Sequence, residues 1–293
     1  MDKATQVAHS SIDCGMPVYE PDSSLLRAVD SIKSQTLLPD NVFIRDDASI
    51  TPRAHEVLGR LNAPHLSVRT NKKNIGMFKN FFSVLQDSRN EYFIFLAQDD
   101  YWMPNHLESL REVLAKNPSA VVAISGIDLH VEGSVIASYL PTPVPGTNIM
   151  SKFKVIHHFF QGKRLNNSIY YGLWRRERLS TIFDHMLRYG LENNEKLTVA
   201  LGFLSGDIAC VENKSFIKSH ARRKSQSGLG FGLSNSKYFL KLVRIFTKYT
   251  RCLAVYPYGG AVFKAIIITY SLFSTLKKLF FRNVSDILRA FTR

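Results

Sequence analysis

The stretch from residue 92 to residue 102 constrains this chain most. It reads Tyr-Phe-Ile-Phe-Leu-Ala-Gln-Asp-Asp-Tyr-Trp, six apolar residues followed closely by the carboxylates of Asp99 and Asp100. Such a run is typical of a strand buried on both faces, and Pro104 suits the first turn of a following helix. In an open α/β sheet, ligands bind beyond the carboxyl ends of the strands. The stretch therefore predicts a strand that brings two carboxylates to a ligand site, where they would hold a divalent cation against a phosphorylated substrate.

The sequence on either side has the same strand-then-helix rhythm. Strands are predicted at 12–18, 42–45 and 66–69, and helices at 25–36, 52–61, 77–86 and 105–116. Four strand–helix units in the first 120 residues or so predict a parallel sheet with helices on both faces. Further on, a buried strand is expected at 120–127, helical periodicity around 173–187 and at 195–204, and a last strand at 208–216.

Composition and charge narrow the class of protein. The chain has 293 residues, of which 45% are hydrophobic, and a formal net charge of +14. Such a charge indicates an anionic partner. The three cysteines, Cys14, Cys210 and Cys252, are far apart and lack metal-ligand spacing, which favours a reducing cytoplasm over a disulfide scaffold. Residues 1–11 lack the apolar core of a secretory signal, so we expect a cytoplasmic protein.

The positive charge is concentrated near the C-terminus. Residues 235–293 contain eleven basic residues and one acidic residue, Asp286. We therefore expect a catalytic domain over 1–234 and a basic, apolar helical tail over 235–293. The uncharged segment 265–276 is shorter than the ~20 residues of a bilayer span. Helices lying on an anionic membrane surface fit best, while packing against the catalytic domain and a re-entrant or spanning segment remain alternatives.

Four motifs follow the predicted strands in order, and together they resemble the family-2 glycosyltransferases of the GT-A fold. They are Pro17-Val18-Tyr19-Glu20, Asp46-Asp47-Ala48-Ser49, Asn74-Ile75-Gly76 with Lys79-Asn80, and Gln98-Asp99-Asp100-Tyr101-Trp102. The last is similar to the form in a rhamnosyltransferase-like bacterial branch. The resemblance covers residues 10–125 well and 150–230 loosely. It implies an α/β, Rossmann-like, mostly parallel sheet between helices, with a donor half at about 10–125 and an acceptor half at about 126–234.

The resemblance also implies a set of donor-binding residues. Asp47 would hydrogen-bond the nucleobase with Asp46 beside it, and Pro17 and Tyr19 would flank the base. The remaining members of the implied set are Glu20, which stands where the family usually has Asn, and Asn74, Gly76, Lys79, Gln98 and Asp99. Two structural alternatives stay open: an Asx-turn that closes the strand at the first acidic pair, and a solvated helix face for the lysine.

A divalent cation, Mg²⁺ or Mn²⁺, is implied at the second acidic pair. Its charge would neutralise the departing diphosphate without a proton transfer. Asp99 is the first candidate ligand, Asp100 the second and His220 a further one, whereas capping of the following helix is the structural alternative for the pair. The first aspartate of the family's D-x-D motif is Ala97 here, so one carboxylate is missing.

Inverting transfer also needs a general base on a different element. Glu195, at the start of a predicted helix, is the candidate, and Glu192 is the second choice. Acidic residues also suit any helix N-terminus through the macrodipole, which is the structural alternative. Trp174 is better interpreted as a core residue than as a sugar-stacking one.

These observations predict an inverting glycosyltransferase at the inner face of the cell membrane. It would move a sugar from a nucleotide-diphosphate sugar to a lipid-linked or oligosaccharide acceptor in bacterial surface polysaccharide synthesis, for example of an O-antigen. Ala97 leaves open a catalytically degenerate scaffold subunit. A nucleic-acid-binding protein is disfavoured because the basic residues lie on apolar segments without a reader motif, and a nucleotidyltransferase because a Gly-rich phosphate loop is missing near the N-terminus.

Overall fold

The fold is described from a computed structural model. It describes residues 11–63, 65–141, 169–191 and 195–220, together with 247–248, 250–258, 261, 264–265 and 268–269 of the predicted tail. The side chains of residues 195, 196 and 220 are outside the description.

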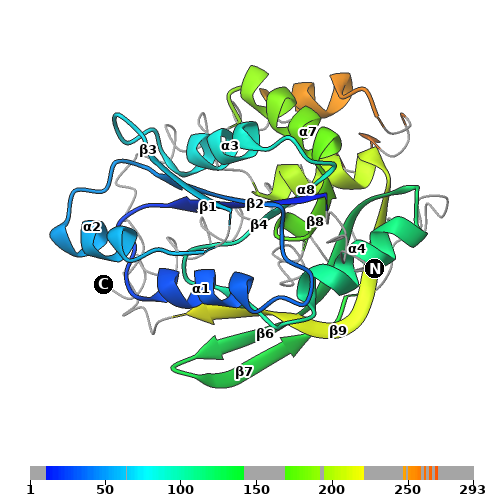
Figure 1. Cartoon of the computed structure of the whole chain (residues 1–293). Coiled ribbons are helices and arrows are strands. Elements are labelled where there is room, and N and C mark those ends of the chain that lie inside the picture. Colours follow the sequence, from blue (N-terminus) through cyan, green and yellow to red (C-terminus); the bar gives the residue numbers. More distant parts are fainter. Residues whose placement is uncertain are drawn as a thin grey trace, which may run out of the picture.

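One sheet organises the molecule (Figure 1). Its strands, in the order β3-β2-β1-β4-β8-β6-β9-β5, with β7 paired to β6 off this path, are β1 (Ile12–Val18), β2 (Asn41–Asp46), β3 (Leu66–Thr70), β4 (Tyr92–Phe95), β5 (Tyr101–Trp102), β6 (Ala120–Val131), β7 (Ser134–Tyr139), β8 (Leu173–Arg175) and β9 (Asp207–His220). The neighbours β3, β2, β1 and β4 are parallel, as the four strand–helix units predict. Their carboxyl ends therefore meet at one edge of the sheet.

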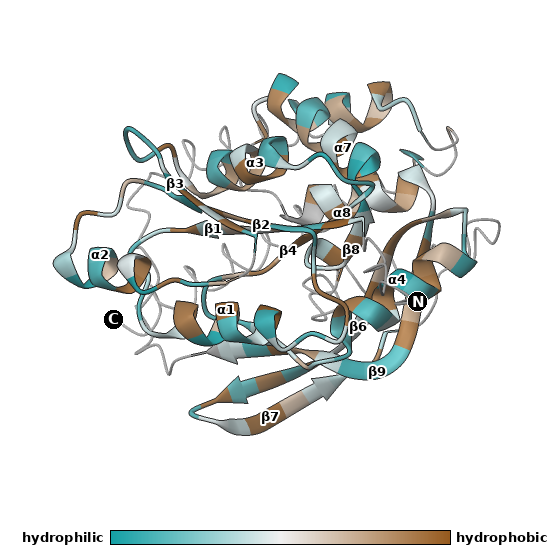
Figure 2. Cartoon of the chain, viewed as in Figure 1, coloured by the Kyte–Doolittle hydropathy of each residue, from teal (hydrophilic) through white to brown (hydrophobic). Residues whose placement is uncertain are grey.

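Helices cover the two faces of the β1–β4 region, with α3 and α7 on one face and α1 on the other (Figure 1). The helices are α1 (Ser24–Lys33), α2 (Pro52–Gly59), α3 (Met77–Asp87), α4 (His106–Lys116), α7 (Arg176–Arg188) and α8 (Glu195–Ser205). Hydropathy follows this layering, because brown residues line the central strands and white to teal residues the outer helix surfaces (Figure 2). All four residues of β4 are buried, as its apolar run predicts.

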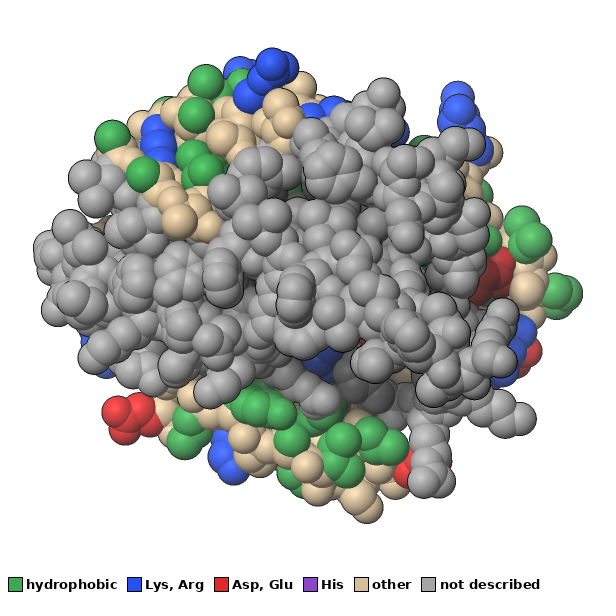
Figure 3. Space-filling model, turned by 180° about the vertical axis from the view of Figure 1, so that it is seen from behind, with side chains coloured by type: hydrophobic (Ala, Val, Ile, Leu, Met, Phe, Trp, Pro, Cys, Tyr) green, Lys and Arg blue, Asp and Glu red, His purple; other side chains and the backbone are tan. Residues whose placement is uncertain are grey.

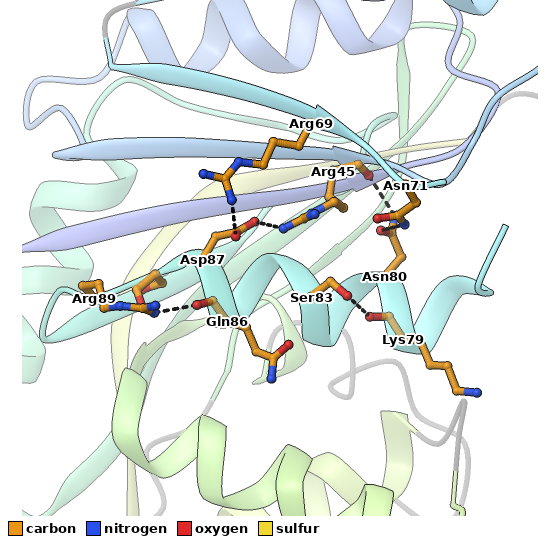
Figure 4. A network of polar contacts seen from close by, with 10 residues as sticks. Arg45, Arg69, Asn71, Lys79, Asn80, Ser83, Gln86, Asp87 and Arg89 are labelled. Atoms are coloured by element: carbon orange, nitrogen blue, oxygen red, sulfur yellow. Dashed lines mark hydrogen bonds and ion pairs between the residues drawn. The ribbon is translucent and has the colours of Figure 1, made fainter. Parts of the chain in front are cut away.

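A charged cluster ties α3 to the sheet (Figure 4). Asp87, at the end of α3, forms ion pairs with Arg45 of β2 and with Arg69 of β3, whose Nη1 lies 3.0 Å from Asp87 Oδ1. Arg45 and Asp87 are mostly shielded from solvent, so this pair is screened less than a surface pair. The cluster fixes the helix that begins at the carboxyl edge of the sheet.

The sequence prediction misses the antiparallel strands. Leu173–Arg175 form β8, which inserts antiparallel between β4 and β6, so the helix predicted around 173–187 begins only at Arg176. The spacing of apolar residues that predicts a helix here is also compatible with a short buried strand, and this explains the wrong prediction. Trp174 is 0% exposed, which confirms its interpretation as a core residue.

The hairpin partner β7 is also absent from the prediction. β7 pairs with β6, and Val135, Ile136 and Leu140 of this region are more than half exposed. In the view from behind, hydrophobic side chains gather along the lower edge of the molecule, where β7 lies (Figure 3). The alternation of polar and apolar residues along β7 is weak, because few of its side chains reach the core.

Part of the predicted tail packs on the catalytic domain. Cys252, Leu253 and Tyr256 are buried in the main hydrophobic core. The imidazole Nε2 of His185 in α7 lies 2.7 Å from the carbonyl oxygen of Cys252, and the hydroxyls of Ser205 and Tyr256 are 2.6 Å apart. For this short portion, packing against the domain is the alternative that holds. Within the described residues, none of the helices combines the length and the hydropathy that crossing a bilayer requires.

Candidate active site

The four sequence motifs lie together at the carboxyl edge of β1–β4. Val18 pairs with Asp46, and Asp46 pairs with Thr70, so the loops that follow these strands start side by side. The loop after β4 joins them through Gln98, whose side-chain amide accepts from Tyr19 N (3.0 Å) and donates to Tyr19 O (3.2 Å). The sequence predicts that Gln98 contacts the donor. In the structure both polar atoms of its amide hydrogen-bond the backbone of Tyr19, another residue of the site.

The carboxylate of Asp47 organises the loop that follows β3. Its Oδ1 accepts from Asn71 Nδ2 (2.9 Å) and Ile75 N (2.8 Å), and its Oδ2 accepts from Gly76 N (2.9 Å). Asp47 is 2% exposed. Its two oxygens are therefore largely committed to the protein, and contact with a nucleobase remains a prediction.

Asp46 faces inward as well. Its carboxylate accepts from the backbone N–H and the hydroxyl of Ser49, and Asp46 is 1% exposed. These hydrogen bonds close the strand end locally, as the structural alternative expects, but they reach Ser49, three residues on, and not the N–H two residues on that an Asx-turn uses. The turn places Ala48 at φ +60°, in the left-handed region where a Cβ is unfavourable.

The loop after β1 presents one aromatic ring to solvent. Tyr19 is 47% exposed, while Pro17 stays in β1 opposite Arg45. Glu20 has φ +47°, and its carboxylate accepts from Ile50 N (2.7 Å) and from the hydroxyl of Thr51. These hydrogen bonds lower the pKa of the Glu20 carboxyl. Glu20 therefore supports the start of α2 and holds the position of the tyrosine beside it.

The loop after β3 contains three more of the predicted residues. Asn74 is exposed, and its Oδ1 accepts from Gly76 N at 3.1 Å. Gly76 adopts φ +87°, which favours glycine. Lys79 follows on α3 and extends away from the Asp87 cluster, and Asn80 points back into the site (Figure 4). Asn80 Nδ2 donates to Arg45 O at 2.8 Å.

The two carboxylates of the second acidic pair, Asp99 and Asp100, have different surroundings. Asp99 is exposed, and none of the described residues hydrogen-bonds its carboxylate. Asp100 is 1% exposed, and its carboxylate accepts from Ser219 N (3.0 Å) and lies 3.5 Å from Lys218 Nζ. Burial raises the pKa of the Asp100 carboxyl to about 6, against the attraction of the Lys218 ammonium. Of the two predicted ligands, Asp99 is the one that offers its oxygens to solvent.

Three residues at this site are absent from the sequence prediction. Lys218 and Ser219 come from β9 and contact the Asp99-Asp100 turn, and Arg27 of α1 donates from Nη2 to Asp99 O (3.1 Å) and to Ser219 Oγ (3.0 Å). These contacts join positions 72 to 192 residues apart. No local pattern signals them, because only the closure of the sheet brings β9 to this turn.

The predicted general bases are less fully placed. Glu195 is the first residue of α8, and its side chain lies outside the description. Glu192 falls in the undescribed residues 192–194, and His220 ends β9 directly after Ser219, again without a described side chain. Their roles stay predictions.

The described residues fit a cation held by one carboxylate. Among them, no group of three or more His, Cys, Asp or Glu side chains lies close enough together to hold a metal ion with protein ligands alone. Mg²⁺ is often held by one or two carboxylates together with substrate phosphates and water. The exposed carboxylate of Asp99 is of the kind that such a site uses, whereas Ala97, which is partly buried against the core, has no ligand atom in its side chain.

Comparison with known proteins agrees with this geometry. The model of the family described as "Glycosyl transferase family 2" matches residues 13–182, more than half of the chain and all four motifs.

The chain belongs to glycosyl transferase family 2.

Solved structures share the family-2 fold of this chain at low sequence identity. S. aureus TarS 1–349 superposes with a TM-score of 0.60 at 13% identity, covering 91% of this chain and 72% of TarS 1–349. Its complex with UDP-GlcNAc gives a TM-score of 0.59 at 13% identity, covering 88% and 71% of the two chains. The expected GT-A-type α/β fold is confirmed.

Sequence relatives cover a shorter stretch. Uncharacterized proteins of Mycobacterium bovis and Mycobacterium tuberculosis are 30% identical over 130 residues, which is 42% of this chain and 37% of each relative. The chain thus matches little more than a third of the length of these relatives, and it covers 42% of the chain in another S. aureus TarS structure.

Proposed function

We propose that this protein transfers a sugar from a nucleotide-diphosphate sugar to a lipid-linked or oligosaccharide acceptor, with inversion, in the synthesis of a bacterial surface polysaccharide. The observation that carries the proposal is the exposed carboxylate of Asp99 at the carboxyl edge of a family-2 sheet, directly after Gln98, which hydrogen-bonds the backbone of the exposed Tyr19. TarS, which shares the fold, forms complexes with UDP-GlcNAc and UDP. These complexes support a nucleotide-sugar donor and make UDP the first probe. The motif Gln98-Asp99-Asp100-Tyr101-Trp102 favours a hexose or a deoxyhexose such as rhamnose.

In this proposal Asp99 would hold Mg²⁺ or Mn²⁺. When bound, the ion would supply positive charge against the negative charge that develops on the leaving diphosphate. Around it, Gln98 fixes the backbone of Tyr19, and the Ser219 N–H fixes Asp100. The chain's contribution at this half of the site is a turn that is held rigidly and leaves one carboxylate exposed.

The acceptor half supplies the base. The acceptor hydroxyl oxygen attacks the anomeric carbon, the bond from that carbon to the diphosphate oxygen breaks, and the hydroxyl proton passes to a carboxylate. We assign this carboxylate to Glu195 at the start of α8, with Glu192 as the second choice and His220 as a group near the metal. Replacing Glu195 by Gln is expected to reduce transfer while nucleotide affinity stays within a few-fold.

Two measurements test the proposed donor. The first is a panel of nucleotide-diphosphate sugars added to the full chain with and without Mn²⁺, read as the melting temperature. One donor is expected to stabilise the protein in a Mn²⁺-dependent way, through preferential binding to the folded state. The second is release of nucleoside diphosphate, which Asp99→Ala should abolish. Asp30→Asn removes an exposed carboxylate that pairs with Lys33 on the same face of α1, and it serves as the control. A panel in which no donor shifts the melting temperature contradicts the proposal.

Membrane association is proposed for the tail. Its charge would hold the enzyme on anionic lipid at the inner face of the cell membrane, at about 1 kcal/mol per basic residue near the surface. Because Cys252 and Tyr256 are buried in the domain, substitutions test this better than a deletion. Replacing Lys277, Lys278, Arg282 and Arg289 by Gln should lower sedimentation with phosphatidylglycerol vesicles. Four exposed basic residues of the domain, Lys33, Arg60, Lys72 and Lys116, replaced together by Gln, form the matched control, and equal loss in both variants contradicts the role of the tail.

Ala97 favours a second candidate, a family-2 domain that binds a nucleotide sugar without turning it over. The release assay separates the two candidates. A wild-type protein that binds the donor but releases nucleoside diphosphate no faster than Asp99→Ala is a binding subunit.

A further inference from the structure

Arg27 of α1 has a fixed place beside Asp99. Its Nη2 donates to Asp99 O at 3.1 Å and to Ser219 Oγ at 3.0 Å, and its guanidinium carbon lies 4.7 Å from the centre of the Tyr101 ring. Two separate segments, the turn at 99–101 and β9, therefore hold this exposed side chain in one position. Cation–π contact adds to the two hydrogen bonds.

Much of the hydrogen-bonding capacity of Arg27 is still available. A guanidinium has five N–H donors, and both hydrogen bonds use Nη2. Within the described part of the chain, Nε and Nη1 donate to no other residue. The hydrogen bonds from the hydroxyl and the N–H of Ser24 lower the pKa of the Asp22 carboxyl, and the Arg27 charge adds a smaller contribution, so this carboxylate is already matched by Ser24.

Few negative charges near Arg27 remain to oppose its positive charge. The Asp100 carboxylate is already matched by Lys218 and the Ser219 N–H, and Ala97 contributes no charge. Among the described residues at this turn, Asp99 is the one exposed carboxylate. A cation at Asp99 reverses the sign of that carboxylate's field, and Arg27 then adds a second positive charge to the same face. The planar fork of a guanidinium matches phosphate oxygens in a bidentate way.

We propose that Arg27 binds the diphosphate of the donor directly through Nε and Nη1, beside the cation that Asp99 holds. The inference rests on the proposed function. It predicts that part of the affinity for nucleoside diphosphates is independent of metal and grows with the number of phosphates.

The test is calorimetric titration of the full chain with uridine, UMP, UDP and inorganic pyrophosphate, in EDTA and in Mn²⁺. A hydrogen bond to a charged group contributes about 1.5–3 kcal/mol, so Arg27→Gln should weaken UDP and pyrophosphate binding about 10- to 100-fold in EDTA. Uridine binding should stay within two-fold. Arg27→Lys keeps the charge without the fork and should lie between the two. Lys33→Gln, which removes an exposed charge from the same helix, should match the wild type.

The series separates a ligand from a structural latch. If Arg27 only holds the Asp99 turn in place, Arg27→Gln weakens uridine and UDP by the same factor, and the proposal is wrong. Unchanged UDP affinity in Arg27→Gln overturns it as well. Both results leave the proposed function standing when wild-type UDP binding is strengthened by Mn²⁺. A wild-type protein that binds neither pyrophosphate nor UDP in either buffer contradicts the proposed function itself, and this inference with it.

Discussion

Asp46-Asp47 and Asp99-Asp100 both follow buried strands of the same parallel sheet, yet the structure uses them differently. After β2, both carboxylates point inward, accept hydrogen bonds from the chain and are at most 2% exposed. After β4, Asp100 repeats that pattern, whereas Asp99 is exposed. The difference lies in the supply of nearby backbone donors. The loop at 71–76 folds over Asp47. At the second pair β9 donates to the Asp100 carboxylate and Arg27 to the backbone oxygen of Asp99, and no described residue donates to the Asp99 carboxylate. An acidic pair at a strand end thus leaves a carboxylate open to a ligand only where the surrounding chain supplies it with no donor.

The largest effect is expected at Asp99. Asp99→Asn should lower the transfer rate about 1,000-fold, because a bound cation contributes several kcal/mol to leaving-group stabilisation. The melting temperature should stay close to that of the wild type, since no described residue hydrogen-bonds this carboxylate. Steady-state release of nucleoside diphosphate and thermal unfolding measure the two quantities. Activity within ten-fold of the wild type would put the cation elsewhere.

Asp47 should show the opposite behaviour. Asp47→Ala leaves the N–H of Ile75 without its acceptor and takes one of two acceptors from the N–H of Gly76, so the free energy of unfolding should fall by about 2 kcal/mol. Asp47→Asn keeps one acceptor oxygen and should lose less. Urea denaturation measures both variants. If Asp47→Ala keeps wild-type stability but loses nucleotide binding, the main role of Asp47 is to contact the ligand and not to hold the loop.

The contrast between buried and exposed polar groups also applies to His106 of α4, a buried histidine that can take up a proton once the protein unfolds. It is 1% exposed, its Nδ1 lies 2.8 Å from Ser215 Oγ, and burial lowers its pKa to about 3. The unfolded state takes up a proton below about pH 6.5 and the folded state does not, so this histidine costs stability as the pH falls. The difference in unfolding free energy between His106→Gln and wild type should therefore shift by about 1.4 kcal/mol per pH unit below 6.5, in favour of the variant. A difference that is constant between pH 7 and pH 4.5 contradicts the buried, neutral imidazole.

The smallest effect concerns the turn that the Asp46 carboxylate closes with Ser49. Ala48 adopts φ +60°, a conformation that costs a residue with a Cβ about 1–2 kcal/mol, while glycine costs more entropy in the unfolded chain. Ala48→Gly should raise the free energy of unfolding by up to about 1 kcal/mol. Gly76→Ala, at φ +87° where an added Cβ would meet only open space, should lower it by a similar amount. Urea titrations of the two variants check the signs, and a loss of stability in Ala48→Gly contradicts the strained turn.

Local patterns predict the donor half of the fold well. Strand, turn and helix alternate within short stretches there, so β1 to β4 and their helices follow from spacing and turn residues. The antiparallel β8 could not be predicted, because a strand of three residues such as Leu173–Arg175 is too short to show a period. Asp99 follows from its place after a buried strand. Arg27 and Lys218 do not, since their contacts depend on the path of β9 through the whole sheet.

The most direct test of this account is calorimetry. It measures the affinity for UDP, with and without Mn²⁺, of the wild type, Asp99→Asn and Asp100→Asn. The account predicts that Mn²⁺ strengthens UDP binding in the wild type, that Asp99→Asn removes this gain, and that Asp100→Asn keeps it within a few-fold as long as the variant is folded. A Mn²⁺ gain that survives in Asp99→Asn, or that disappears only in a folded Asp100→Asn protein, would contradict the assignment of the exposed carboxylate as the ligand.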